Sequence, residues 1–135
     1  MAYQWTSDLE TGNRIIDRQH RELIDAINRL LESCSRGQGR TEIESTLKFL
    51  NNYIIRHFSD EEALQQRYKY PDKVRHKQYH EAFKRSVAEI VAEFEQSGAS
   101  IAFVAKVNSV IAGWLISHIK REDVKVAAHI KKMEG

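Results

Sequence analysis

The 135-residue sequence predicts an all-α fold, an up-down-up-down antiparallel four-helix bundle with an N-terminal arm. Two observations support this fold. Hydrophobic residues recur at alternating steps of four and three residues along four separate segments, and this spacing keeps them on one face of a helix. The breaks between the segments are short, and short connections favour antiparallel neighbours. The length suits a single domain over residues 1–135.

Three breaks bound the elements, at Ser35–Gly39, Tyr70–Asp72 and Ser97–Ser100. Gly, Ser and Pro interrupt the helical periodicity there, and Pro71 suits the start of a helix. We therefore expect an arm over residues 1–12, helices over approximately residues 13–35, 41–66, 71–96 and 100–121, and a C-terminal tail over residues 122–135. The tail either extends the fourth helix or turns back.

Each predicted helix carries one stripe of inward-facing positions, and the four stripes together would form the bundle core. In chain order the stripes are Ile16, His20, Leu23, Ile27, Leu30 and Cys34; Ile43, Leu47, Leu50, Ile54, His57, Glu61 and Leu64; His76, His80, Phe83, Val87, Ile90 and Phe94; and Val104, Val107, Ile111, Trp114 and His118.

Composition and charge narrow the classes of function. The formal net charge is +2 and basic residues are mixed with acidic ones, which argues against a nucleic-acid-binding surface. No apolar run approaches the length of a membrane span, and the N-terminus has neither a basic start nor an apolar signal core. Cys34 is the only cysteine, which excludes an internal disulfide, and we interpret it as a small apolar helix residue. We expect a cytoplasmic protein that binds neither nucleic acid nor membranes.

Polar residues interrupt all four stripes at a shared level. Hydrophobic stripes normally stay hydrophobic, because burying an unpaired polar group is costly. The interruptions come early in the first and third helices and late in the second and fourth, which is the same end of an antiparallel bundle. They are His20, His57, Glu61, His76, His80 and His118, followed by Asp123 or Glu122.

This set has the composition of a transition-metal site, because imidazoles with a few carboxylates suit first-row metals. Seven ligands exceed what one ion needs, so the set indicates two metals. Residues four apart on a helix differ by about 40° in direction. His57 with Glu61, and His76 with His80, can therefore each point inward as a pair, and the carboxylate of Glu61 could bridge two cations.

Two simpler interpretations explain less of the pattern. Some of the histidines could be neutral core residues that bond to backbone carbonyls, but five at one level are hard to explain in this way. A single structural zinc would use about four ligands and leave three unexplained. His129 lies beyond the shared level, and we interpret it as an ordinary surface or packing residue.

The last ligand is ambiguous on spacing. Glu122 follows His118 by four residues and is the better-aimed partner. Asp123 follows by five residues, about 140° round an ideal helix, and would need a local widening of the helix or its end. Spacing alone leaves both residues open.

Several motifs resemble those of a known family. They run over nearly the whole chain and include all seven ligand positions: Trp5, Thr11–Asn13, Ile16–His20, His57–Glu62, Tyr70-Pro71, His76–His80 and Trp114–Asp123. In this ordered set the sequence resembles the hemerythrins, specifically the single-domain bacterial hemerythrins.

The resemblance implies a non-haem centre of two iron ions with an oxo or hydroxo bridge, which binds O2 reversibly for storage, delivery or scavenging. By analogy with the family, His76, His80 and His118 would bind one iron. His20 and His57 would bind the second iron, which keeps an open position for O2.

The family pattern also implies that Glu61 and Asp123 bridge the two irons, and so favours Asp123 over Glu122. Leu115 matches a position of the family's dry O2 pocket, and spacing suggests further lining residues. The predicted pocket residues are Leu115, Ile24, Phe58, Trp114 and Ile119.

Two other functions stay open at this point. A di-iron oxidase or peroxidase would share the helical scaffold, but such enzymes use mostly carboxylates, with paired Glu-x-x-His motifs. A sensor of O2 or redox state would act through a partner protein. We therefore expect a protein that is not an enzyme, with O2 as its ligand. An O2-consuming or signalling protein is the candidate partner.

Overall fold

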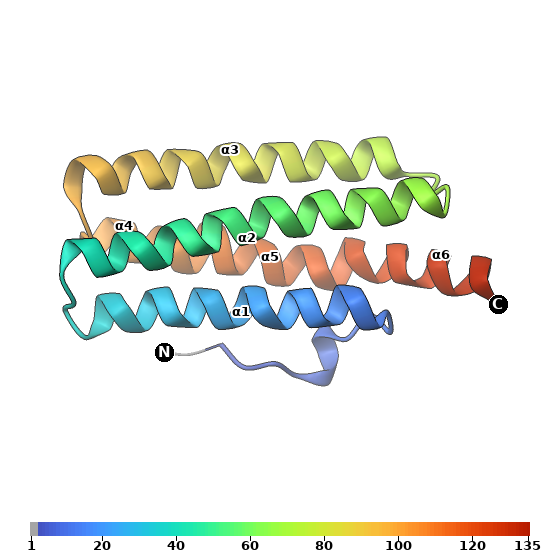
Figure 1. Cartoon of the computed structure of the whole chain (residues 1–135), viewed down its shortest axis with the longest axis horizontal. Coiled ribbons are helices and arrows are strands. Elements are labelled where there is room, and N and C mark those ends of the chain that lie inside the picture. The colour runs from blue at the N-terminus through green and yellow to red at the C-terminus, as the bar shows by residue number, and fades with distance from the viewer. Residues whose placement is uncertain (1–2) are drawn as a thin grey trace.

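Four long helices lie side by side and alternate in direction (Figure 1). The structure is a computed structural model that describes residues 3–135, so the first two residues of the predicted arm lie outside the described residues. A 3-10 helix, η1 (Ser7–Leu9), precedes α1 (Arg14–Ser35), α2 (Arg40–Arg67) and α3 (Lys73–Ser97). α2 contacts both α1 and α3, and the last helix closes the bundle against α1 and α3. The predicted four-helix bundle is confirmed.

The last helix is continuous from Ile101 to Glu134. It consists of α4 (Ile101–Lys106), η2 (Val107–Ala112), α5 (Gly113–His118), η3 (Ile119–Asp123) and α6 (Val124–Glu134), of which η2 and η3 are π-helical. The C-terminal tail therefore extends the fourth helix instead of turning back. Val126 and Ile130 of α6 are buried with Ile16 and Tyr70, which anchors this extension.

The π-helical turn η2 shifts the register of the last helix. A π turn bonds each amide to the carbonyl five residues back and so adds one residue to the turn. Side chains stabilise this segment, since the Asn108 amide donates to the carbonyl of Val104 at 3.2 Å. As a result Phe103 and Leu115 are buried. Val104 and Trp114, which the predicted stripe placed inward, are only half-buried. The stripe of α3, which has no such turn, is buried as predicted from His76 to Phe94.

Asn13 determines where α1 begins. Its Oδ1 accepts hydrogen bonds from the amides of Ile15 and Ile16, both at 3.0 Å. These are two of the four amides that have no partner inside the helix.

Replacing Asn13 with Ala is expected to lower the free energy of unfolding by about 1 kcal/mol, because the first turn loses its side-chain cap. Urea denaturation measures this change. Asn52→Ala, at an exposed position in the middle of α2, is the matched control and should cost nothing. An unchanged midpoint in the Asn13 variant would show that the cap does not stabilise the helix.

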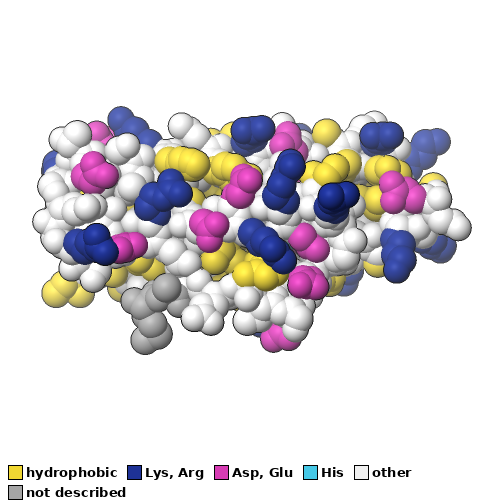
Figure 2. All heavy atoms as spheres, turned by 60° about the horizontal axis from the view of Figure 1, so that its bottom comes forward, with side chains coloured by type: hydrophobic (Ala, Val, Ile, Leu, Met, Phe, Trp, Pro, Cys, Tyr) yellow, Lys and Arg dark blue, Asp and Glu magenta, His cyan; other side chains and the backbone are white. Residues whose placement is uncertain are grey.

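The surface carries both signs of charge. On the face drawn in Figure 2, basic and acidic side chains alternate along the length of the molecule, with hydrophobic groups between them. This face therefore has no continuous patch of one charge.

The last helix is long and apolar enough to cross a membrane by length and composition. The sequence-based statement that no segment approaches a membrane span is therefore wrong for this helix. Phe103, Val107 and Ile111 of the same helix are fully buried in the bundle core. Core packing accounts for these hydrophobic residues, and the absence of a membrane partner stays a prediction.

Candidate metal centre

Seven polar side chains from all four long helices meet inside the bundle, and all seven are buried. The same side chains interrupt the predicted stripes. They come from α1 (His20), α2 (His57 and Glu61), α3 (His76 and His80), α5 (His118) and η3 (Asp123).

The two oxygens of Glu61 face different histidines. Its Oε1 lies 2.7 Å from Nε2 of His76 and 3.3 Å from Nε2 of His80. Its Oε2 lies 3.8 Å from Nε2 of His57. The carboxylate thus lies between two sets of imidazoles.

Asp123 repeats this arrangement from the opposite helix. Its Oδ1 lies 3.0 Å from Nε2 of His118 and 3.1 Å from Nε2 of His76. Its Oδ2 lies 2.9 Å from Nε2 of His20. Each carboxylate therefore directs one oxygen toward each set of imidazoles.

The donor atoms form two overlapping groups, within each of which all atoms lie within 4.8 Å of one another. One group contains three imidazoles and the other contains two, and both contain Glu61 and Asp123. Two cation positions that share two carboxylates match this arrangement, whereas a single tetrahedral ion would use only part of it.

The chemistry of the donors fits metal ions. Nε2 of His118 lies 3.1 Å from Nε2 of His76, so two imidazole nitrogens face each other in the interior. Among the described residues, several buried inward atoms are close to other donors but lack a partner with hydrogen-bond geometry, including Nε2 of His20 and of His80, Oε2 of Glu61 and Oδ1 of Asp123. Unpaired buried polar atoms are costly, and cations between them would remove that cost.

The protonation states also suit metal binding, with one exception. Burial lowers the pKa of His57 to about 4, which keeps its ring neutral. Burial and the nearby carboxylate of Asp123 oppose ionisation of Glu61, but the close imidazoles of His76 and His80 outweigh them and lower the pKa of Glu61 to about 2. Burial would also lower the pKa of His76, yet the neighbouring carboxylates of Asp123 and Glu61 raise it to about 9. A metal ion must therefore displace a proton from His76 at neutral pH.

The π-helical turn η3 explains which acidic residue faces inward. In this turn, residues five apart lie on nearly the same face, so Asp123 lies beneath His118. Glu122 is only half-buried and lies 3.9 Å from Lys125 on the outside of the helix. The local widening that Asp123 requires is present.

Comparison with known proteins identifies the family. Residues 11–130 match the model of the hemerythrin HHE cation binding domain. The chain belongs to the hemerythrin family. It is similar to a bacteriohemerythrin of Pseudomonas paraeruginosa, with 34% identity over 88% of this chain and 75% of that protein. It is also similar to a bacteriohemerythrin of Stenotrophomonas maltophilia, with 32% identity over 94% of this chain and 80% of that protein.

A solved structure of a hemerythrin mutant has the same fold. It superposes with a TM-score of 0.84 at 26% sequence identity and covers 96% of this chain and 98% of its own. The long helices of this chain thus form a hemerythrin-type helical bundle.

Two residues that the sequence analysis did not identify contact the outward-facing ring nitrogens of histidines in the cluster. Nδ1 of His57 lies 2.7 Å from Oε1 of Gln19, and Nδ1 of His80 lies 2.9 Å from Oε2 of Glu62. Gln19 and Glu62 stand next to His20 and Glu61 in the sequence, but each contacts a histidine on the neighbouring helix. Only the relative rotation of the helices brings these pairs together.

The five residues predicted to line an O2 pocket lie in or beside the hydrophobic core. The ring of Phe58 stacks on His80 with centroids 3.8 Å apart, and Trp114 stacks on His118 with centroids 4.4 Å apart. Leu115 is buried in the same core cluster as Phe58. Ile24 and Ile119 are buried in a second cluster, with Leu9.

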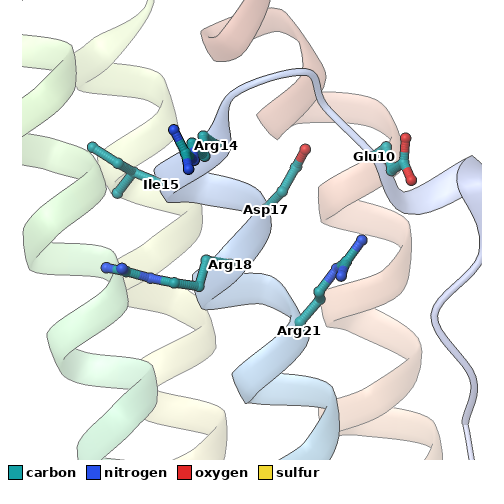
Figure 3. Close-up of a pocket in the computed structure, with 6 residues that line it drawn as sticks. All are labelled: Glu10, Arg14, Ile15, Asp17, Arg18 and Arg21. Atoms are coloured by element: carbon teal, nitrogen blue, oxygen red, sulfur yellow. The ribbon is translucent and has the colours of Figure 1, made fainter.

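Other polar features lie outside the cluster. His129 is separate from both donor groups, and its Nε2 lies 2.7 Å from the carbonyl oxygen of Tyr68. A surface hollow of about 590 Å³ lies beside the first turns of α1 and is lined by Arg14, Arg18 and Arg21, which Figure 3 draws with Asp17. Asp17 already accepts hydrogen bonds from Thr11, so its carboxylate shapes the entry to α1. This hollow contains none of the seven donors.

Proposed function

We propose that this protein binds O2 reversibly at two iron ions inside the bundle, bridged by an oxo or hydroxo group. The proposed ligands are His20, His57, Glu61, His76, His80, His118 and Asp123. The observation that carries the proposal is the arrangement of Glu61 and Asp123, each of which directs one oxygen toward the group of three imidazoles and the other toward the group of two.

The unequal number of imidazoles supports a site for O2. His76, His80 and His118 belong to one donor group, whereas only His20 and His57 belong to the other. The second group thus offers one protein ligand fewer, which favours an open position there. When bound, ferrous iron would supply the two electrons and the open ligand position that reversible O2 binding needs.

The surrounding side chains support binding more than turnover. Leu115 and Phe58 are almost fully buried, and we propose that they and their neighbours Ile24, Trp114 and Ile119 keep water from the bound gas. Apart from the seven donors, the buried side chains with polar groups among the described residues are those of Gln19, Ser33, Gln65 and Tyr70. The phenol of Tyr70 is the one acid among these four, and its ring centroid lies 6.2 Å from that of His76. A carrier needs no further proton donor, and we propose that the protein is not an enzyme.

Cycles of reduction and O2 exposure test the proposal. The protein is loaded anaerobically with ferrous iron, and iron content and absorption spectra are measured while O2 is added and then removed. We expect two irons per chain and an absorption band that forms with O2 and disappears on its removal, over several cycles. Two irons that oxidise once, with no reversible band, would contradict reversible binding and favour an enzyme or a sensor.

Replacing Leu115 with Ala is expected to leave the iron content at two per chain but to accelerate autoxidation several-fold, because the cavity admits water. The loss of a buried Leu should also cost roughly 2–5 kcal/mol of stability. The decay of the oxygenated absorption band measures the rate. Leu47→Ala removes an equally buried side chain far from the donors and is the matched control. Equal decay rates in the two variants would assign Leu115 to packing alone.

A further inference from the structure

Two histidines of the metal centre have hydrogen-bond partners on their outward nitrogens, and the two partners differ in charge. Glu62 lies beside His80 with a carboxylate oxygen 2.9 Å from Nδ1. Gln19 lies beside His57 with an amide oxygen 2.7 Å from Nδ1. Nδ1 of His20 and of His76 are buried without such a partner among residues 3–135.

The orientation of the Gln19 amide follows from its second contact. Its Nε2 lies 2.8 Å from Oδ2 of Asp60, and an ionised carboxylate only accepts hydrogen bonds. The amide nitrogen must therefore face Asp60, and the amide oxygen must face His57. His57 accordingly donates from Nδ1 and presents an unprotonated Nε2 to the interior.

The contact with Glu62 places a ring proton on Nδ1 of His80, as on His57, but the acceptor here is a carboxylate. The side chain of Glu62 is about 25% exposed, while that of His80 is fully buried. A carboxylate that accepts a ring N–H increases the basicity of the opposite nitrogen toward a metal, and a neutral amide does so less. Phe58, stacked flat on His80 at 3.8 Å, holds the ring plane in this position.

The two contacts fall on different donor groups. His80 belongs to the group of three imidazoles, and His57 belongs to the group of two. We propose that Glu62 and Gln19 are positioning residues that make the two metal positions differ in electron donation. Glu62 makes His80 a stronger electron donor to its metal than Gln19 makes His57. The position with three imidazoles therefore stabilises the higher metal charge better than the position with two. This proposal rests on the proposed di-iron function.

Charge-changing variants of matched shape test the proposal. Glu62→Gln keeps an acceptor beside His80 but removes the charge. The double variant Gln19→Glu/Asp60→Asn puts a carboxylate at residue 19, beside His57, and removes the one at residue 60. The net charge is unchanged, and two carboxylates do not come to lie next to each other. Glu89→Gln, at an exposed position on α3, is the control for loss of a surface charge.

The readout is the reduction potential of the iron-loaded protein by spectroelectrochemical titration, after iron content has been measured. In Glu62→Gln we expect the equilibrium constant that favours the oxidised state to fall about tenfold. The reduction potential then rises by about 59 mV for a one-electron step. The Gln19→Glu/Asp60→Asn variant should shift the potential about as far in the opposite direction. Two irons in every variant with potentials equal to that of the Glu89→Gln control would overturn the proposal.

Histidine tautomers in the metal-free protein separate this proposal from the di-iron function. By ¹⁵N NMR at neutral pH, His80 and His57 should carry their ring protons on Nδ1. Fewer than two irons in the unmodified protein would contradict the di-iron function. The positions of the ring protons would still test the contacts of Glu62 with His80 and of Gln19 with His57. A neutral His80 protonated on Nε2 alone would overturn the proposal whatever the metal content.

Discussion

Replacing Glu61 with Gln is expected to reduce the iron bound after anaerobic loading and desalting from two ions per chain to one or none. Gln has nearly the same shape, but it loses the charge and one of the two oxygens that face different histidines. Loss of a hydrogen-bond partner of a metal ligand typically lowers metal affinity by about 10–100-fold. Loss of a ligand that both metals share should therefore lower it by more than about 100-fold. Iron content per chain measures the effect.

Glu89→Gln removes the same charge at an exposed position of α3 and should bind as much iron as the unmodified protein. Circular dichroism checks that both variants keep the bundle. If folded Glu61→Gln protein retained two irons with unchanged affinity, Glu61 would not be a bridging ligand.

Removal of iron is expected to lower the midpoint of thermal unfolding by roughly 10–20 °C. A ligand at a thousand times its Kd stabilises the folded state by about 4 kcal/mol, and each kcal/mol shifts the midpoint of a domain of this size by about 3–5 °C. The physical reason lies in the donors themselves, which bury oxygen and nitrogen atoms without partners when no cation lies between them.

Anaerobic melting curves of the iron-loaded and chelator-treated protein measure this difference. Because Glu61→Gln is expected to bind little iron, its midpoint should hardly respond to iron addition. A midpoint of the unmodified protein that is independent of iron would mean that the bundle holds its donors in place without any contribution from the metal.

Local periodicity was enough to predict the bundle and the meeting of the stripes. The stripe of α3 from His76 to Phe94 is buried as predicted, because no irregular turn interrupts that helix. Spacing was less reliable in the last helix. There two π-helical turns shift the register. Leu115 is therefore buried where spacing placed Trp114, and Asp123 is buried where spacing favoured Glu122.

The contacts of Gln19 and Glu62 could not be predicted for a different reason. Each joins one helix to its neighbour, and depends on the rotation of the two helices about their axes. A stripe identifies the face that points inward, but not which polar atom at the edge of that face reaches a given ring nitrogen. The meeting of the seven polar side chains was therefore accessible from the sequence, whereas the contacts of Gln19 and Glu62 were not.

The most direct test of the central claim is anomalous diffraction at the iron absorption edge from crystals of the iron-loaded protein. Two iron peaks per chain are expected, one beside His76, His80 and His118 and one beside His20 and His57, with Glu61 and Asp123 in contact with both. A single peak with about four ligands would contradict a shared two-iron centre and would indicate a mononuclear metal site.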